Sequence, residues 1–208
     1  MKIPVEIRDN STGEIVQANL FDAITIEHFI ETQKEWRPLV IAATRKLAAS
    51  KLAAGDYVPA HFHWDWTSKE AQLKLLAIHF YGIEHLGVLQ GIMKVESVGH
   101  VCRLPVQQGK PVIHIDYLEV APWNVKQIME ALGKRTKYGA VGTRLIEAAV
   151  RHSIEEGFKG RVALHSLSTS ERFYREVCNM TPVGRDSGKQ NLLWCEFTPE
   201  QAQNFIGD

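Results

Sequence analysis

Apolar and polar residues alternate along residues 4–16 around a short run of Asp, Asn, Ser, Thr and Gly. Alternation is the period of a β-strand and those polar residues form turns, so the segment is predicted to be a hairpin. Thr25 is placed to cap a helix that runs to about Trp36, and Pro38 is placed to begin a second helix that stops at Gly55.

The middle of the chain changes to a run of short apolar segments. Residues 67–70 read Thr-Ser-Lys-Glu, a capping box that predicts a third helical stretch. Apolar runs at residues 76–83, 88–95 and 98–104 predict three successive strands, and residues 107–111 predict a turn. Helices followed by adjacent strands are therefore expected before the C-terminal half.

Strands and helices alternate in the C-terminal half. Residues 143–154 carry apolar side chains at the spacing of a helix with one buried face, and Gly157 is placed to end it. A turn is predicted at residues 184–191. The other expected elements are a strand ending at residues 118–120, a strand at 161–165, a helix at 168–177 and a strand at 192–197.

A loop of small residues leads into the helix at residues 143–154. It reads Lys-Tyr-Gly-Ala-Val-Gly over residues 137–142. The first amides of a helix have no internal acceptor and carry partial positive charge, so an anion such as a pyrophosphate is their natural partner. Small side chains let such a ligand approach the backbone. The alternative is a tight strand-to-helix turn without a ligand.

This order of strand, small-residue loop, helix, strand and a helix containing Phe173 and Tyr174 resembles the GNAT superfamily, the acetyl-CoA-dependent N-acetyltransferases of bacterial type. The resemblance is close in the C-terminal half and covers the N-terminal half in outline. It implies an α/β fold with a central, twisted, mostly antiparallel sheet. A parallel strand pair would splay at the cofactor site, and helices would cover both faces.

The resemblance also implies a single domain over residues 1–208, long enough to bury a substantial core. Its expected parts are an N-terminal hairpin at 1–20, acceptor-side helices and strands at 21–111, an acetyl-CoA-binding core at 112–182, and a C-terminal strand and tail at 183–208.

Acetyl-CoA is the cofactor that the resemblance implies. Lys137 takes the family's basic position in the loop, Ala140 stands for its first glycine and Gly142 is the second. The segment from Trp123 to Thr136 is longer than usual, and a small helix is predicted in it around residues 126–132. The expected cofactor-binding residues are Leu118, Glu119, Val120, Lys137, Tyr138, Gly139, Ala140, Val141, Gly142, Thr143, Ser168 and Phe173.

Acetyl transfer to an amine needs a base for the ammonium proton and an acid for the departing thiolate. The resemblance assigns the acid to Tyr174, behind a capping box at residues 168–171. For the base, the resemblance makes His114 and Asp116 the first choice, because relatives carry catalytic residues at these positions. The two share one strand face, and a nearby carboxylate raises the basicity of a histidine. Glu119 is the second candidate and His165 the third. A water relay without an essential base is the alternative.

The acceptor is expected near an aromatic segment that contains Trp64, Asp65 and Trp66, and near Trp123. Indole faces and a carboxylate suit a cationic amine, while core packing is the competing interpretation. His61 and His63 lack the carboxylate or cysteine partners of a metal site, so no metal is predicted.

The chain has no formal net charge at pH 7, so it creates no strong overall electrostatic field. Lys plus Arg and Asp plus Glu number 24 each, so no nucleic acid or membrane partner is expected. Three cysteines without metal spacing and the absence of an apolar leader predict reduced thiols and a cytoplasmic location. Exposed apolar residues near Phe197 and Phe205 make a homodimer conceivable.

The sequence therefore predicts an N-acetyltransferase that moves the acetyl group directly from the thioester to a primary amine of a small molecule or peptide. Two alternatives remain open. One is a coenzyme-A-binding regulatory module without transfer chemistry, and the other is a protein-interaction domain that uses the fold alone.

Overall fold

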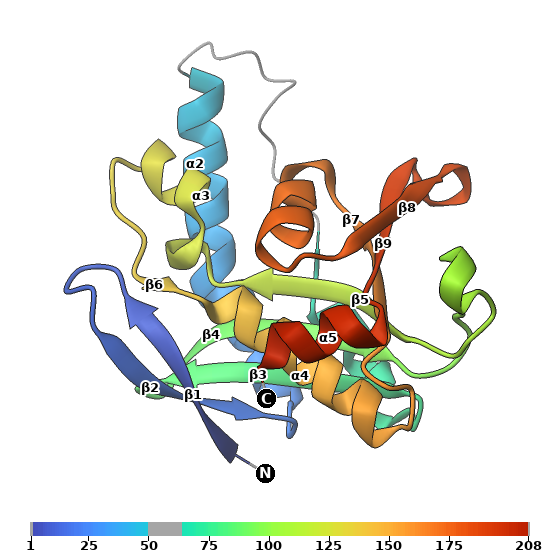
Figure 1. Cartoon of the computed structure of the whole chain (residues 1–208). Coiled ribbons are helices and arrows are strands. Elements are labelled where there is room, and N and C mark those ends of the chain that lie inside the picture. Colours follow the sequence, from blue (N-terminus) through green and yellow to red (C-terminus); the bar gives the residue numbers. More distant parts are fainter. Residues whose placement is uncertain (1, 50–63, 208) are drawn as a thin grey trace. The chain divides into compact units, whose positions relative to one another are not determined.

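The computed structural model describes residues 2–49 and 64–207 of the chain (Figure 1). Nine strands of these residues form one sheet in the order β6-β1-β2-β3-β4-β5-β7-β9-β8. The strands are β1 (Lys2–Asp9), β2 (Ile15–Phe21), β3 (Ile78–His85), β4 (Val88–Glu96), β5 (Ile113–Val120), β6 (Tyr138–Gly139), β7 (Val162–Ser166), β8 (Thr181–Asp186) and β9 (Leu192–Glu196). The α-helices are α1 (Ile26–Glu31), α2 (Arg37–Ala49), α3 (Lys126–Ala131), α4 (Val141–Glu155) and α5 (Pro199–Ile206).

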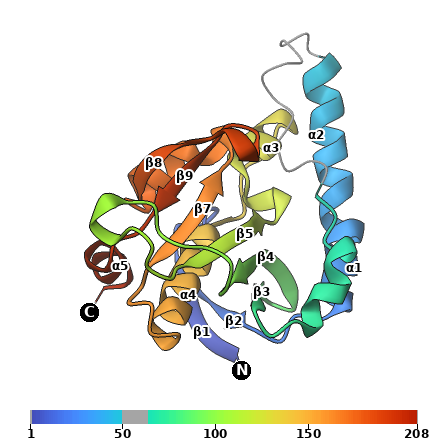
Figure 2. The ribbon, with the colours of Figure 1, turned by 90° about the vertical axis from the view of Figure 1, so that its right-hand side faces the viewer.

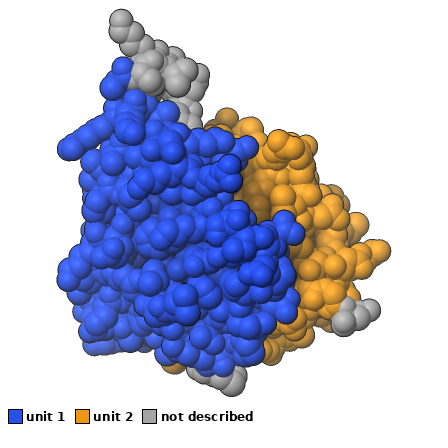
Figure 3. All heavy atoms as spheres, turned by 90° about the vertical axis from the view of Figure 1, so that its left-hand side faces the viewer, with its two compact units in different colours: residues 1–74, 80–92, 119–145 blue, residues 75–79, 93–118, 146–208 orange. Residues whose placement is uncertain are grey.

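The chain divides into two compact units, drawn in blue and orange in Figure 3. Unit 1 comprises residues 1–74, 80–92 and 119–145, and unit 2 comprises residues 75–79, 93–118 and 146–208. Strands β3, β4 and β5 and helix α4 each contribute residues to both units. No helix among the described residues is both long and apolar enough to span a membrane.

Unit 1 contains the N-terminal hairpin that the alternating pattern predicts. β1 and β2 pair antiparallel, from Lys2 opposite Phe21 to Arg8 opposite Ile15. The turn between them contains Gly13 in the left-handed region, at φ 79°. β3 pairs with β2, and the short strand β6 pairs with the end of β1.

Helices α1 and α2 form one rod, seen end to end in Figure 2. Thr25 caps α1 as predicted, but the expected break before Pro38 is absent, because a π-helical turn at Thr32–Trp36 joins the two helices. Pro38 has no N–H, and its ring crowds the carbonyl four residues back. The turn bypasses this, since the Arg37 amide donates to the carbonyl of Thr32 instead. The predicted end at Gly55 lies outside the described residues.

Unit 2 contains the predicted parallel strand pair. β5 and β7 run parallel from Ile113 opposite Val162 to Ile115 opposite Leu164, and β9 and β8 continue antiparallel beyond β7. These strands are rich in β-branched and aromatic residues, and Ile113, Val162 and Trp194 are at most 1% exposed. The apolar runs of the sequence therefore form the core of this unit.

Two predicted elements of unit 2 differ in the structure. Residues 98–104 form no strand, because Gly99 takes φ 87° and the amides of Arg103 and Leu104 donate to the buried carboxylate of Glu196. Residues 168–177 are helical but irregular, with a 3-10 turn at Ser168–Ser170 and a π turn at Phe173–Val177. The predicted capping box is not formed there. Glu171 pairs with Arg185 at 3.0 Å instead.

The C-terminal end contains two elements that the sequence analysis missed. β8 takes part of the predicted turn, and α5 starts from a capping box of Thr198 and Gln201. Phe197 is fully buried and stacks near Phe205, with ring centroids 5.2 Å apart. Phe197 is therefore not an exposed apolar residue, and the expectation of a homodimer loses that basis.

Candidate active site

The loop that leads into α4 is held in place by the N-terminal hairpin. β6 pairs Gly139 with Arg8, and the amide of Asn10 donates to the carbonyl of Lys137 at 2.8 Å. Ala140 takes φ 67°, the left-handed region that favours glycine. This is the position at which the resembling family carries its first glycine. The backbone has the glycine conformation although the residue is alanine.

Hydrogen bonds join the two ends of the long segment at residues 123–136, which precedes the loop. The amide of Lys137 donates to the carbonyl of Trp123 at 2.8 Å, and the amide of Tyr138 donates to the side-chain oxygen of Asn124 at 3.0 Å. Between these ends lies α3, which confirms the small helix predicted there. α3 packs on α2 through Ile128, which contacts Val40 and Ala43. The insertion therefore folds beside α2 without lengthening the loop.

Gln90 ties the end of β5 to the same segment. Its backbone carbonyl accepts from the amide of Ala121 at 2.8 Å, and its side-chain oxygen accepts from the indole N–H of Trp123 at 2.8 Å. Gln90 is 2% exposed, so these bonds form away from water. The sequence analysis missed this residue. Its signal is a lone glutamine inside the apolar run of β4.

The first turn of α4 packs closely on β4. A Cβ atom at Gly91 would lie 2.8 Å from Cγ1 of Val141 and 3.1 Å from Cδ1 of Leu145. The guanidinium Nε of Arg144 also donates to the carbonyl of Glu6 at 2.8 Å. The start of α4 is therefore fixed from two sides, and Lys134, Arg135 and Lys137 stand exposed just before it.

Glu119 is the most strongly perturbed carboxyl group of unit 1. Burial raises its pKa to about 7, against the opposing effects of the Trp66 hydrogen bond and the charge of Lys69. The indole N–H of Trp66 donates to its Oε2 at 2.6 Å. A carboxyl group with a pKa near neutrality can accept a proton at physiological pH.

Glu119 lies in the lining of a hollow built mostly from aromatic side chains and the π-helical turn. Trp36 lines this hollow and is 2% exposed, and its indole N–H has no hydrogen-bond partner among the described residues. An orphan donor and a carboxyl group that titrates near neutrality are features of a ligand site. The lining residues are Thr32, Gln33, Trp36, Arg37, Val40, Trp64, Trp66 and Glu119.

The predicted acceptor residues separate in the structure. Trp64 and Trp66 line the hollow, whereas Asp65 accepts hydrogen bonds from Thr67 and Gln33. The hydrogen bond from the Thr67 hydroxyl lowers the pKa of Asp65. Trp123 is 8% exposed and packs edge-on against Trp36, with centroids 6.4 Å apart. Asp65 and Trp123 thus have structural partners within unit 1.

In unit 2, His114 lies between two rings. It stacks on His100 with centroids 3.9 Å apart and on Trp194 with centroids 5.5 Å apart. Burial, followed by the charges of His100 and His165, lowers its pKa to about 3. His114 is therefore neutral at physiological pH. The expectation that Asp116 raises its basicity is wrong, because burial dominates.

Asp116 and His165 each contact an ionisable side chain. Asp116 accepts from Nζ of Lys94 at 2.6 Å, and this ammonium is almost fully buried. His165 lies 3.0 Å from Oδ2 of Asp186, which also binds Arg103 at 2.8 Å. Burial lowers the pKa of His165 despite this carboxylate. Among the three predicted bases of unit 2, the structure brings two together, with Nε2 of His114 at 3.4 Å from Nδ1 of His165.

Tyr174 occupies the π-helical turn of unit 2. Burial raises the pKa of its phenol, which stays protonated at neutral pH, as a proton donor must. Its ring packs against Phe173 with centroids 5.1 Å apart. Ser168 begins the 3-10 turn before it, and Leu118 and Val120 are half-buried residues of β5.

No family model and no curated protein matches the sequence. The structure is similar to a GNAT family acetyltransferase of Listeria monocytogenes 4b F2365, with 12% identity and a TM-score of 0.53 over 93% of this chain and 99% of that chain. It is also similar to the PaiA N-acetyltransferase of Thermoplasma acidophilum in complex with coenzyme A, with 13% identity and a TM-score of 0.50 over 87% and 98%.

A third similar structure is the aminoglycoside acetyltransferase AAC(6')-Ib in complex with coenzyme A and kanamycin. Its identity is 14% and its TM-score 0.50, over 90% of this chain and 98% of that chain. The chain therefore has the fold of the GNAT acetyltransferases, as the resemblance in its C-terminal half predicts. The mixed sheet with one parallel strand pair is the architecture that the resemblance implies.

Proposed function

We propose that the protein is an N-acetyltransferase that transfers the acetyl group of acetyl-CoA to a primary amine. The fold supports this class, because two of the similar structures hold coenzyme A. The observation that carries the proposal is the loop before α4. Its left-handed Ala140 and its hydrogen bonds to Asn10 and Trp123 fix the backbone in front of the helix amides.

The pyrophosphate of the coenzyme is proposed to bind at this helix start. The amides of Val141, Gly142 and Thr143 lie in the first turn and have no acceptor within the helix. The exposed cations Lys134, Arg135 and Lys137 add positive charge beside the helix start. Both contributions favour an anionic ligand, so acetyl-CoA rather than a neutral cofactor is the expected partner.

Glu119 is proposed as the general base. The attacking amine forms a bond to the thioester carbonyl carbon, its proton passes to the Glu119 carboxylate directly or through water, and the carbon–sulfur bond then breaks. The pKa of about 7 supports this role. A pKa of about 3 makes His114 a weaker base than the sequence predicts. Tyr174 remains the predicted donor of a proton to the thiolate.

The acceptor is proposed to be a small molecule with a cationic amine. Trp36, Trp64 and Trp66 surround Glu119 in the hollow of unit 1, and indole faces attract ammonium groups. The orphan N–H of Trp36 would donate to a hydroxyl or carbonyl oxygen of the same molecule. Kanamycin, held by the aminoglycoside acetyltransferase with this fold, combines amine and hydroxyl groups.

A thermal-unfolding titration with acetyl-CoA and with coenzyme A tests the cofactor, because a ligand of the native state raises the melting temperature by mass action. Gly142→Val is expected to weaken the coenzyme affinity at least tenfold by blocking access to the amides. Gly184→Val is the matched control, since a Cβ atom there meets nothing within 4 Å.

Thiol release in the presence of an amine panel then tests turnover. Release that depends on both the amine and Glu119 supports the proposal. Coenzyme binding without release for any amine would identify a regulatory module. No shift at millimolar coenzyme would contradict the proposed cofactor and leave the fold as a scaffold.

A further inference from the structure

Two groups of three side chains in unit 2 bring possible metal-ligand atoms together. Among the described residues these are His79, His152 and Glu156, and Glu96, His100 and His114. In each group the ligand atoms lie within 4.8 Å of one another. The two groups differ in the contacts that their possible ligand atoms already make, and this difference shows which group is better suited to bind a metal.

The second group is committed to other contacts. The rings of His100 and His114 stack at an interplanar angle of 19°, so their in-plane lone pairs do not converge on one point. Glu96 binds the buried ammonium of Lys94 at 2.8 Å as well as His100 at 3.0 Å. A cation at this place would have to displace an existing one.

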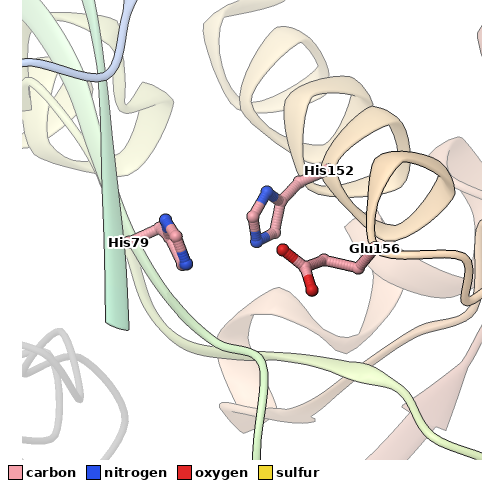
Figure 4. Close-up of side chains that lie close together, drawn as sticks. All are labelled: His79, His152 and Glu156. Carbon is pink, nitrogen blue, oxygen red and sulfur yellow. The ribbon is translucent and has the colours of Figure 1, made fainter. Parts of the chain in front are cut away.

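The first group has the arrangement of a chelate. His152 and Glu156 stand four residues apart at the end of α4, on one face of the helix, and the amide of Glu156 still donates to the carbonyl of His152 at 2.9 Å. His79 faces them from β3, with its ring 4.3 Å from that of His152 and tilted by 52°. Figure 4 shows the Glu156 carboxylate directed toward the two imidazoles.

From this geometry we propose that His79, His152 and Glu156 form a site for a divalent transition metal, zinc above all. Two imidazole nitrogens and one carboxylate oxygen are a ligand set that zinc prefers. Donor atoms around a tetrahedral zinc lie roughly 3.3 Å apart, so ligand atoms that lie within 4.8 Å of one another have to close by at most about 1.5 Å. Glu156 is exposed and free to turn its side chain, and water would take the fourth position.

The surroundings favour a cation at this place. The C-terminal end of a helix carries partial negative charge, and both His152 and Glu156 lie at that end of α4. Bound metal would fasten the start of β3 to the end of α4 within unit 2.

Cobalt(II) titration of the whole protein tests the site, because tetrahedral cobalt has visible d–d bands, and zinc competition then gives the zinc affinity. Glu156→Gln is expected to weaken the affinity at least tenfold. Glu155→Gln removes the same charge from the same helix end and is expected to keep the wild-type affinity. His79→Gln provides a second variant, and circular dichroism without metal checks that each variant is folded.

Zinc is also expected to raise the melting temperature of the wild type and of Glu155→Gln, but not of Glu156→Gln. Equal affinities of the Glu155 and Glu156 variants would overturn the proposal. The proposal would also be overturned if His100→Gln removed the cobalt spectrum and Glu156→Gln left it intact, because that result would place the metal among Glu96, His100 and His114. The test requires neither coenzyme nor acceptor, so it stands apart from the proposed activity.

Discussion

Burial, more than charged partners, sets the pKa of two candidate bases on β5, Glu119 and His114. Glu119 and His114 lie on the same strand, yet burial raises the pKa of the carboxyl group and lowers that of the imidazole. In both groups the neutral form is favoured. The result favours Glu119 over His114 as the base, since the pKa of Glu119 is about 7 and that of His114 is about 3.

The first prediction concerns the stability that depends on Glu119. Its pKa of about 7 in the folded protein lies above the ordinary glutamate value of 4.5, so this stabilisation is complete below pH 4.5 and is lost as pH rises through 7. Glu119→Gln keeps an acceptor for Trp66 without a charge. It should raise the free energy of unfolding by about 2 kcal/mol at pH 8, a figure discounted because the side chain is only partly buried, and leave it unchanged at pH 4.5.

Denaturant unfolding at the two pH values measures this difference. Glu70→Gln, a change at an exposed glutamate, controls for net charge. A gain of equal size at both pH values would contradict the assigned pKa.

The proposed role of Glu119 as a base also predicts that the rate of acetyl transfer rises with pH to a plateau above about 7. Glu119→Gln should lose that pH dependence.

At the scale of elements, the start of α4 is positioned by tight packing rather than by the loop alone. Val141 and Leu145 lie against the backbone of Gly91, and the short strand β6 holds the loop to β1. A helix start that is fixed on both sides presents its amides in one place. This explains how the loop tolerates alanine at position 140.

Gly91→Ala tests this packing. The new methyl group would lie 2.8 Å from Cγ1 of Val141, a stiff β-branched side chain, so the helix start has to move. Unfolding should become easier by roughly 1–3 kcal/mol, and coenzyme affinity should fall. Gly184→Ala, in β8 with open space around it, is expected to change neither quantity. Unchanged coenzyme affinity in Gly91→Ala would separate the coenzyme site from the helix start.

The elements that the sequence predicts best are those with a strong local signal. The hairpin, α1 and α4 follow from period, caps and apolar runs, whereas the parallel pair was expected from the resemblance to the GNAT superfamily. The apolar run at residues 98–104 predicts a strand, but none forms, because Glu196, far along the chain, supplies the acceptors for the amides of Arg103 and Leu104. The π-helical turn before Pro38 likewise has no signature in residue type alone. Long-range partners decide where local patterns are ambiguous.

At the scale of the whole molecule, the predicted site residues are divided between the two units. Glu119, Trp64, Trp66 and the loop belong to unit 1, and the histidines and Tyr174 belong to unit 2. Sequence reasoning ranked Glu119 second among the candidate bases, behind His114 and Asp116, because it could not foresee a pKa that depends on Trp66 and on burial. The sequence analysis did not select Gln90 or Trp36 as site residues, because their roles depend on contacts with residues distant in the sequence.

The cysteines allow a prediction for the molecule as a whole. All three are buried and free, and burial raises the pKa of Cys102 and Cys178 to about 12 and that of Cys195 to about 11. The folded protein should react with a thiol reagent far more slowly than free thiol, and all 3 groups should react after denaturation. A fast thiol in the native protein would instead favour a covalent acyl-cysteine route over direct transfer.

The hydrogen bond between the amide of Lys137 and the carbonyl of Trp123 has a consequence for how this chain can vary. It holds the two ends of the segment between them next to each other. Insertions or deletions within this segment therefore need not move the loop before α4, so the protein can acquire new sequence here. A library of variants with altered length between Asn124 and Gly133, which keeps Lys134 and Arg135 in place, should therefore retain coenzyme binding while its acceptor preference changes.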